Sequence, residues 1–172
     1  LLTTAAYRHK GKMAYALEGS CYIAGAAVQW LRDNVHLIKK SSEVENLARK
    51  VKDLKNVENV LFMPFFTGIG SPHWRPEAKA AILGLTRDTN DTHLCWACLE
   101  GMALSINDLV EAFRKDTGMA IKQLKVDGGA VENDLLMQMQ ATISETPLIS
   151  PMVCVQPVSL ARREESSQYF PS

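Results

Sequence analysis

The sequence predicts an α/β domain, in which strands and helices alternate along the chain and pack in layers. Short apolar, β-branched runs alternate with longer segments whose apolar residues recur at helical spacing. Clusters of glycine, proline and asparagine separate these segments. The chain has 172 residues, of which 47% are hydrophobic and 22% charged, and this composition suits one globular domain with a substantial core.

The first third of the chain is predicted to form a hairpin and two helices. Residues 1–7 and 13–17 have the pattern of two strands joined by a polar turn. A helix rich in small apolar residues is expected from Ser20 to about Val35. A charged helix is expected over 41–52, with an apolar inner stripe: Val44, Leu47 and Val51.

The middle of the chain is predicted to contain two strands, a long loop and the longest helix. Strands are expected over 60–63 and 80–85, separated by a loop rich in glycine, proline and aromatic residues over 64–76. A helix follows over 90–115, because Asn90 begins it as a cap and Gly118 ends it.

The last part is predicted to be strand, helix, strand and tail. These elements cover 123–126, 132–144 and 147–151. We therefore expect one domain over 1–153 and a divergent tail over 154–172, whose last fifteen or so residues are poorly ordered.

Charge and cysteine usage narrow the classes of function. Lys+Arg and Asp+Glu are both 19, and this balance argues against a nucleic-acid partner. No apolar run is long enough for an integral membrane segment. Cys95 and Cys98 lie three apart inside a predicted helix, where buried, reduced thiols are expected rather than a redox pair, and this favours a cytoplasmic location. Because the chain opens at Leu1, we expect it to lack a beginning.

The run from Lys125 to Asn133 predicts a strand, a tight glycine turn and a helix N-terminus. Such a turn lets a ligand lie against bare backbone, and the free N–H groups of a first helical turn favour polar or anionic ligand groups. A plain strand-to-helix turn is the alternative.

Two glycine–amide pairs could together clamp a flat polar ligand such as a nucleoside. Gln29 follows Gly25 by one helical turn, and Asn133 follows Gly129 in the same way. The alternative is close helix packing at Gly25 and a helix cap at Asn133, and spacing alone leaves both open.

The remaining polar residues indicate no catalytic or metal site. The Gly-x-Gly of loop 64–76 precedes Pro72 and no helix, so it is not a dinucleotide fingerprint. Long ordered loops of this kind often line sites, and the alternative is that Trp74 and the two Phe residues pin the loop to the core. The histidines have no metal-ligand spacing. An acid such as Asp127 before two glycines is expected to fix its own turn, and Asn107 and Asp108 are expected to face solvent.

Five runs of the sequence are informative when taken together: Tyr15–Ser20, Ala24–Asp33, Phe66–Trp74, Leu83–Arg87 and Val126–Asn133. They resemble the C-terminal lobe of the FGGY carbohydrate kinases. The stretches Tyr15–Gly19 and Gln29–Asp33 within them favour the glycerol kinase branch. The resemblance implies an actin-like ATPase (ribonuclease H-like) fold, here as the incomplete C-terminal lobe of a two-lobed kinase. It implies that ATP with Mg²⁺ binds mainly on this lobe. The family positions that contact the nucleotide match Gly25, Gln29, Gly129 and Asn133, with Val28 beside the adenine.

The same resemblance implies ATP-dependent phosphorylation of glycerol to glycerol 3-phosphate. The family's general base and its glycerol-binding residues belong to an N-terminal lobe that these runs do not match, so we expect this chain alone to be inactive. The resemblance leaves open whether the protein self-associates into a homo-oligomer. Two departures stand out: Arg75 replaces a common acid, and 155–161 replaces a Glu-x-Thr-Ala-Leu-Gly-Ala-Ala helix. The alternatives are a stand-alone nucleotide-binding module and an inactive fragment.

Overall fold

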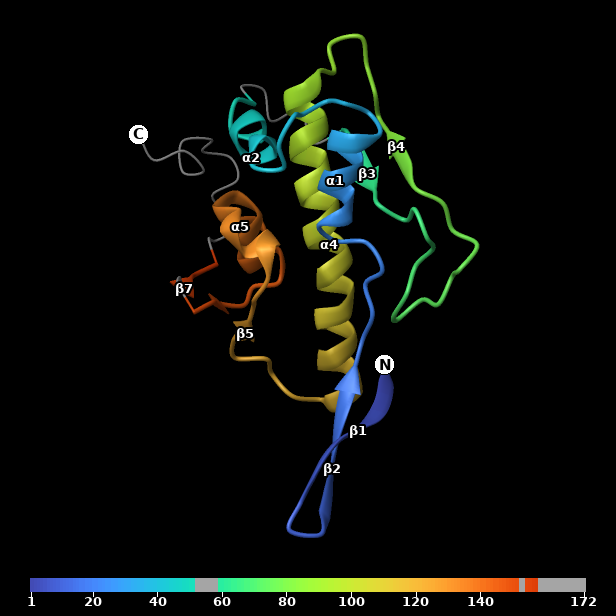
Figure 1. Cartoon of the computed structure of the whole chain (residues 1–172), viewed down its shortest axis with the longest axis vertical. Helices are drawn as coiled ribbons and strands as arrows, with labels where there is room; N and C mark the ends of the chain where they lie inside the picture. The colour runs from blue at the N-terminus through green and yellow to red at the C-terminus, as the bar shows by residue number, and fades with distance from the viewer. Residues whose placement is uncertain (52–58, 152–153, 158–172) are drawn as a thin grey trace.

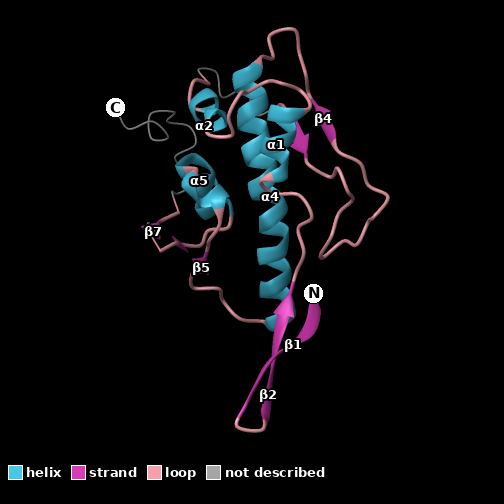
Figure 2. Ribbon diagram, in the orientation of Figure 1, coloured by secondary structure: helices cyan, strands magenta, loops and turns pink. Residues whose placement is uncertain are grey.

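The computed structural model of the protein describes residues 1–51, 59–151 and 154–157. The described elements are β1 (Leu2–His9), β2 (Lys12–Glu18), α1 (Ala26–Asp33), α2 (Glu43–Ala48), β3 (Leu61–Met63), β4 (Ala81–Leu83), α4 (Asp91–Thr117), β5 (Leu124–Lys125), the 3₁₀ helix η1 (Gly129–Glu132), α5 (Asp134–Ile143), β6 (Leu148–Ile149) and β7 (Cys154–Val155). The strands form three small sheets, β1-β2, β3-β4 and β5-β6-β7, beside the helices. The structure thus confirms the α/β alternation predicted from sequence (Figure 2).

Helix α4 runs through the centre of the body of the molecule, and α1, α2, α5 and β3 pack against it (Figure 1). Its ends are where the sequence predicts them. The Asn90 side chain accepts a hydrogen bond from the backbone N–H of Thr92 at 3.0 Å, and His93 Nδ1 accepts one from the N–H of Asn90 at 3.1 Å. Gly118 ends the helix in the left-handed conformation, with φ 65°.

The core forms where α4 meets its neighbours. The largest fully buried side chains come mainly from the four α-helices described and from β6, and include Leu31, Val44, Leu99, Met102, Leu135 and Leu148. Gly101 lets α4 approach β3 closely, because a Cβ at this position would stand 2.1 Å from the carbonyl oxygen of Phe62. Among the described residues, no helix is both long and apolar enough to cross a membrane.

The β1–β2 hairpin matches its prediction and extends away from the body of the protein (Figure 1). Its antiparallel register runs from Leu2 opposite Glu18 to His9 opposite Lys12, with an irregularity between Ala5 and Tyr7. Most side chains of both strands are exposed, so the hairpin has little cover on either face.

The predicted helix start at Ser20 is wrong, because α1 begins at Ala26. The backbone of Ser20 is engaged elsewhere. Its carbonyl accepts a hydrogen bond from the N–H of Ser71 at 2.9 Å, and its own N–H donates to the Ser71 hydroxyl at 3.2 Å. A residue whose backbone groups bond to a distant loop cannot use them in a helix, so the helix starts only after this contact.

Helix α2 is shorter than predicted over its described part. It ends at Ala48, whereas the expected end near Lys52 lies outside the described residues. Val44 and Val51 are buried and Leu47 is half-buried, as the predicted inner stripe requires. Short helices of this kind are stabilised mainly by packing on their apolar side.

Strands β5 and β6 are parallel, and η1 and α5 connect them. Helix α5 starts at Asp134, after the 3₁₀ turn, instead of at the predicted residue 132. The first tail residues also form a strand that the sequence did not predict, since β7 pairs antiparallel with β6. The predicted disorder of the last fifteen residues falls on 158–172, outside the described residues.

Candidate functional site

The glycine turn after β5 is built by its own acid. The N–H of Val126 donates to the carbonyl of Ile149 at 2.9 Å, which holds the chain beside β6. Asp127 Oδ1 then accepts a hydrogen bond from the N–H of Gly128 at 2.7 Å. Gly128 has φ 98°, a conformation that side-chain-bearing residues rarely adopt. Asp127 therefore fixes the turn, as predicted, and Gly128 is required by the backbone.

Gly129 differs from Gly128, because nothing inside the fold requires glycine there. It opens η1 without a left-handed φ, and a Cβ at this position would meet no atom within 4 Å. Its backbone is exposed. The turn thus presents open main chain on its outer side.

Asn133 caps helix α5. Its Oδ1 accepts a hydrogen bond from the N–H of Leu136 at 2.8 Å, and Glu45 of α2 accepts the N–H of Leu135 at 3.2 Å. The cap role that spacing left open is therefore real. Among the described residues the side-chain amide nitrogen of Asn133 has no hydrogen-bond partner, so it can still donate to a ligand.

A shallow hollow of about 320 Å³ lies where the parallel strands β5 and β6 end. Its lining residues are Lys125, Val126, Asp127, Ile149, Ser150 and Pro151. Ligands of α/β proteins bind outside the carboxyl ends of parallel strands. The Ile149–Pro151 wall was not among the predicted site residues, although parallel pairing of 123–126 with 147–151 would have pointed to it.

The other glycine–amide pair sits at the start of α1. Gly25 is the residue before the helix, with φ −54° and ψ −23°, and a Cβ there would meet no atom within 4 Å. Close helix packing does not explain this glycine. Its carbonyl accepts a hydrogen bond from the N–H of Gln29 at 3.2 Å, and the Gln29 side chain is exposed. Val28 is 8% exposed and belongs to the core cluster.

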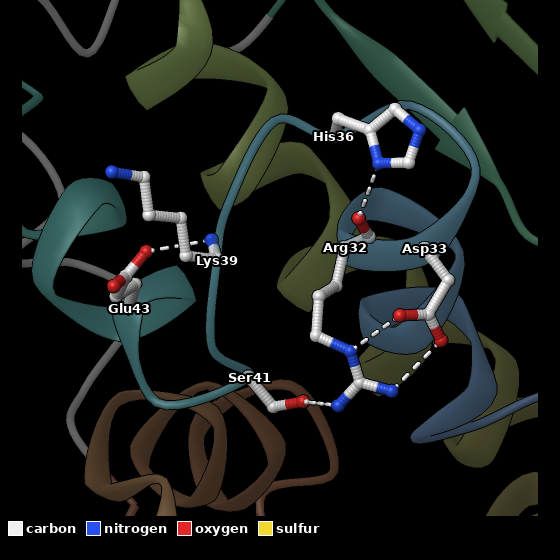
Figure 3. A network of polar contacts seen from close by, with 6 residues as sticks. All are labelled: Arg32, Asp33, His36, Lys39, Ser41 and Glu43. Atoms are coloured by element: carbon white, nitrogen blue, oxygen red, sulfur yellow. Dashed lines mark hydrogen bonds and ion pairs between the residues drawn. The ribbon is translucent and has the colours of Figure 1, made fainter.

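The far end of α1 is tied to the start of α2 by polar contacts (Figure 3). Arg32 donates to both carboxylate oxygens of Asp33, at 2.6 and 2.8 Å, and to the Ser41 hydroxyl at 3.0 Å. The hydrogen bonds from Arg32 lower the pKa of the Asp33 carboxyl. His36 Nδ1 lies 3.2 Å from the carbonyl oxygen of Arg32, and Glu43 accepts the N–H of Lys39 at 2.8 Å. The Arg32 side chain thus has a structural role.

The two pairs lie on separate elements, since α1 packs on α4, whereas η1 packs on α5. Gly25 and Gln29 belong to the start of α1, whereas Gly129 and Asn133 flank η1. The hollow beyond β5 and β6 is lined by no residue of either pair. A clamp shared by Gln29 and Asn133 stays a prediction.

Of the other predictions made from the sequence, some are confirmed and others are wrong. Cys95 and Cys98 are buried free thiols, as predicted. Asn107 does not face solvent, because its Oδ1 is buried without a partner among the described residues. Asp108 is exposed and lies 3.4 Å from His73.

The aromatic residues of loop 64–76 also differ in whether they behave as predicted. The Phe66 ring packs on Trp30, with ring centroids 4.9 Å apart, and so helps to pin the loop to the core. Trp74 is 42% exposed and does not pin the loop. No group of three potential metal ligands occurs in the described part of the chain.

Comparison with known proteins identifies the family to which the chain is similar and the fold that it shares. Residues 1–160 match the model of the C-terminal domain of the FGGY family of carbohydrate kinases. The glycerol kinase of Alkalilimnicola ehrlichii is 50% identical over 151 residues, which cover 88% of this chain and 30% of that protein. That of Rhodopirellula baltica is 50% identical over 153 residues, covering 89% and 28%. The chain thus spans about a third of the length of these relatives.

Two solved structures resemble the chain. The crystal structure of Plasmodium falciparum glycerol kinase with ADP superposes with a TM-score of 0.77 at 36% identity, over 87% of this chain and 29% of the other. A ligand-bound xylulose kinase of Lactobacillus acidophilus gives 0.70 at 23% identity, over 84% and 29%, and speaks for the fold alone. The predicted actin-like ATPase fold of the C-terminal lobe is confirmed.

Proposed function

The chain belongs to the FGGY family of carbohydrate kinases, and on that premise we propose that it supplies the nucleotide-binding half of an ATP-dependent glycerol kinase. The longer relatives are named for glycerol, and one solved relative holds ADP. The reaction moves the γ-phosphoryl group of ATP to a glycerol hydroxyl oxygen, which loses its proton, and yields ADP and glycerol 3-phosphate. The residues that bind glycerol and accept that proton would come from another lobe.

One observation carries the choice of nucleotide site: Gly25 and Gly129 are glycines that the fold itself does not require. Neither has a left-handed φ, and neither would bring a Cβ within 4 Å of another atom. A glycine without an internal reason points to something outside the chain that approaches the backbone closely. Each is followed, four residues on, by an amide side chain.

The proposed contacts follow from this layout. The exposed backbone at Gly129 would lie against the nucleotide, and the free amide nitrogen of Asn133 would donate to it. The exposed carboxamide of Gln29 would donate and accept at the other glycine, with Val28 as apolar neighbour of the adenine. Closure of the two lobes would exclude water from the transferring phosphoryl group.

Mg²⁺ would arrive with the nucleotide and neutralise phosphate charge during transfer. Proteins usually hold Mg²⁺ through one or two carboxylates plus substrate phosphates, not through a dedicated cage. Three carboxylates lie close to the proposed site in the sequence: Asp127 at the glycine turn, and Glu132 and Asp134 on either side of Asn133.

The remaining expectations are proposals of the same kind. We place the domain at 1–153 and treat 154–172 as a divergent tail, although the family match continues to residue 160. The free buried thiols favour a reducing compartment, and we propose the cytoplasm.

Calorimetric titration with ADP and with ATP tests the proposal. We expect binding by the chain, and weaker binding in Gly25→Ala and Gly129→Ala, whose stability stays equal or rises by about 0.5 kcal/mol because alanine fits both backbones. Gly118→Ala is the reciprocal control: its φ of 65° penalises alanine, so stability falls by about 1 kcal/mol while ADP affinity stays.

Three results would speak against the proposal. If the wild-type chain bound no nucleotide, it could not supply the nucleotide-binding half of the kinase. If both alanine variants kept the wild-type affinity for ADP, Gly25 and Gly129 would not belong to the nucleotide site. Phosphorylation of glycerol by this chain alone contradicts the need for another lobe.

A further inference from the structure

The first turn of α5 is held by two acceptors, and one of them comes from another helix. Asn133 Oδ1 accepts the N–H of Leu136 at 2.8 Å. Glu45 Oε1 accepts the N–H of Leu135 at 3.2 Å, although Glu45 lies on α2, ninety residues earlier in the chain. A carboxylate is a favourable partner at this end of a helix, where the N–H groups have no partner within the helix. Glu45 therefore joins α2 to the turn that begins at Asn133.

The Glu45 carboxylate is itself held in place. Arg49, one helical turn later, approaches Glu45 Oε1 with its Nε atom at 2.8 Å and with its Nη2 atom at 2.6 Å. Only 19% of the Glu45 side chain is exposed, so this ion pair is partly shielded from solvent and salt. The carboxylate is therefore oriented and its charge is balanced on the α2 side of the contact.

These contacts decide what the start of α5 can offer to a ligand. Because Leu135 and Leu136 both donate their N–H groups inside the protein, neither group is left for a phosphate. The amide nitrogen of Asn133 remains, beside the exposed backbone of Gly129. A neutral donor of this kind suits a nucleoside, and it contributes to binding only if α5 holds it at the correct place.

Apolar packing alone does not fix α5 that accurately. Helices α1, α2 and α5 all pack on α4, and α2 also packs on α5. Apolar contact is non-directional and tolerates a small shift of one helix along another, whereas a hydrogen bond sets both distance and angle. The start of α2 is also tied to α1, because Arg32 donates to the Ser41 hydroxyl at 3.0 Å (Figure 3). Polar contacts thus run from α1, which carries Gln29, through α2 to the first turn of α5.

We propose that Glu45 is a positioning residue of the nucleotide site: its carboxylate fixes the first turn of α5, and with it the Asn133 amide, relative to α1 and Gln29. Glu45 acts through Asn133 and contacts no ligand itself. The inference rests on the proposed nucleotide site, and it adds a residue that neither glycine–amide pair contains. Its requirement is an accepting oxygen that reaches the Leu135 N–H, and the negative charge is secondary.

Substitutions at Glu45 separate reach from charge, with ADP affinity measured by calorimetric titration. Glu45→Ala should weaken ADP binding about tenfold, the effect typical of losing one hydrogen bond to a charged group. Glu45→Gln keeps the length and an accepting oxygen, so its ADP affinity should stay within about threefold of wild type. Glu45→Asp keeps the charge on a side chain that is shorter by one methylene group, and should bind ADP as weakly as Glu45→Ala.

Two further variants distinguish positioning from a merely structural role. Glu43→Ala, on the same helix, removes the acceptor of the Lys39 N–H, and should lower stability in urea without changing ADP affinity. Asn133→Ser keeps a cap oxygen but lacks the amide, and in this background Glu45→Ala should weaken ADP binding less than about twofold. Equal losses in the two backgrounds would show that Glu45 does not act through Asn133.

Hydrogen exchange tests the contact without nucleotide. Relative to the amides of α4, the Leu135 amide should exchange about tenfold faster in Glu45→Ala than in wild type, and at the wild-type rate in Glu45→Gln. Unchanged Leu135 exchange, or wild-type ADP affinity in Glu45→Ala, would overturn this inference and leave the proposed function intact. A wild-type chain that binds no ADP would contradict the proposed function, and the inference with it.

Discussion

The Nη2 atom of Arg114 lies 2.6 Å from the carbonyl oxygen of Ser144, thirty residues further along the chain. The same atom lies 2.6 Å from the hydroxyl oxygen of Thr146. Both partners are fully buried, whereas Arg114 sits in the last turns of α4. One guanidinium therefore fixes the end of α5 on α4, and α5 carries Asn133 at its other end.

Arg114→Met should lower the free energy of unfolding by about 1.5–3 kcal/mol, the usual worth of hydrogen bonds to a charged donor. The substitution keeps an unbranched apolar stem and removes the guanidinium, so the buried Ser144 carbonyl loses one of its two side-chain donors and keeps only the Thr146 hydroxyl. Urea denaturation measures the effect. Lys115→Met, on the exposed neighbour, should change stability by less than about 0.5 kcal/mol. Equal stability of the two variants would show that the Arg114 contacts contribute nothing.

Two substitutions at Asn133 separate its cap role from its proposed ligand role. Asn133→Asp keeps an oxygen for the N–H of Leu136 and removes the amide donor, so stability should persist while ADP affinity falls. Asn133→Ala removes both, and should also lower the free energy of unfolding by about 1 kcal/mol. Thermal unfolding and ADP titration measure the two quantities. Undiminished ADP binding in Asn133→Asp would assign this residue to the fold alone.

Gln140 and Gln138, two residues apart on α5, should respond oppositely to the same change. Gln140 is 3% exposed, and its side-chain amide has no partner among the described residues. Gln138 donates to the carbonyl of Gln156 at 2.9 Å. Gln140→Met should therefore raise the free energy of unfolding by about 1 kcal/mol, because it removes an unpaired buried polar group. Gln138→Met should lower it by a similar amount.

Denaturant titrations of the two methionine variants decide the matter. A loss of stability in Gln140→Met larger than that in Gln138→Met would mean that the Gln140 amide is satisfied in solution.

Sequence predicted best what local chemistry decides. The ends of α4 follow from a cap at Asn90 and a glycine at Gly118, and both signals lie within a few residues of the helix. The late start of α1 could not be predicted in this way, because the competing contact joins Ser20 to Ser71, 51 residues away. The burial of the Asn107 Oδ1 was missed for a related reason: helical spacing alone does not show which side of α4 other segments of the chain cover.

In the candidate site, too, the feature fixed by neighbouring residues was predicted and the feature that depends on a distant contact was not. The turn at Asp127 and Gly128 was predicted from its residues alone, since the acid bonds the next N–H. The hollow beyond it needed the pairing of β5 with β6, which brings Ile149 beside Val126. Neither segment by itself predicts that it pairs with a strand this far away in the sequence.

The two buried thiols of α4 should make stability fall at alkaline pH. Burial, with a further contribution from Asp91, raises the pKa of Cys95 to about 12. Burial raises the pKa of Cys98 as well, and Cys95 adds to this. In the unfolded chain both thiols ionise near pH 8.5.

The sign follows from proton binding. Below about pH 8.5 both states hold the thiol protons, and stability does not depend on them. Above that pH the unfolded chain releases protons that the folded chain keeps, so ionisation favours unfolding. The loss continues up to about pH 12 for Cys95 and further for Cys98, with a slope of up to about 1.4 kcal/mol per pH unit for each thiol.

Urea denaturation at a series of pH values from 8 upward measures this slope. Cys95→Ala/Cys98→Ala removes both groups and should flatten the alkaline decline, even though its stability at pH 8 is lower. Cys154→Ser, at the exposed thiol, should keep the wild-type slope. If the double alanine variant declined as steeply as the wild type, ionisation of other groups would account for the alkaline loss, and the thiols would not resist ionisation in the folded chain.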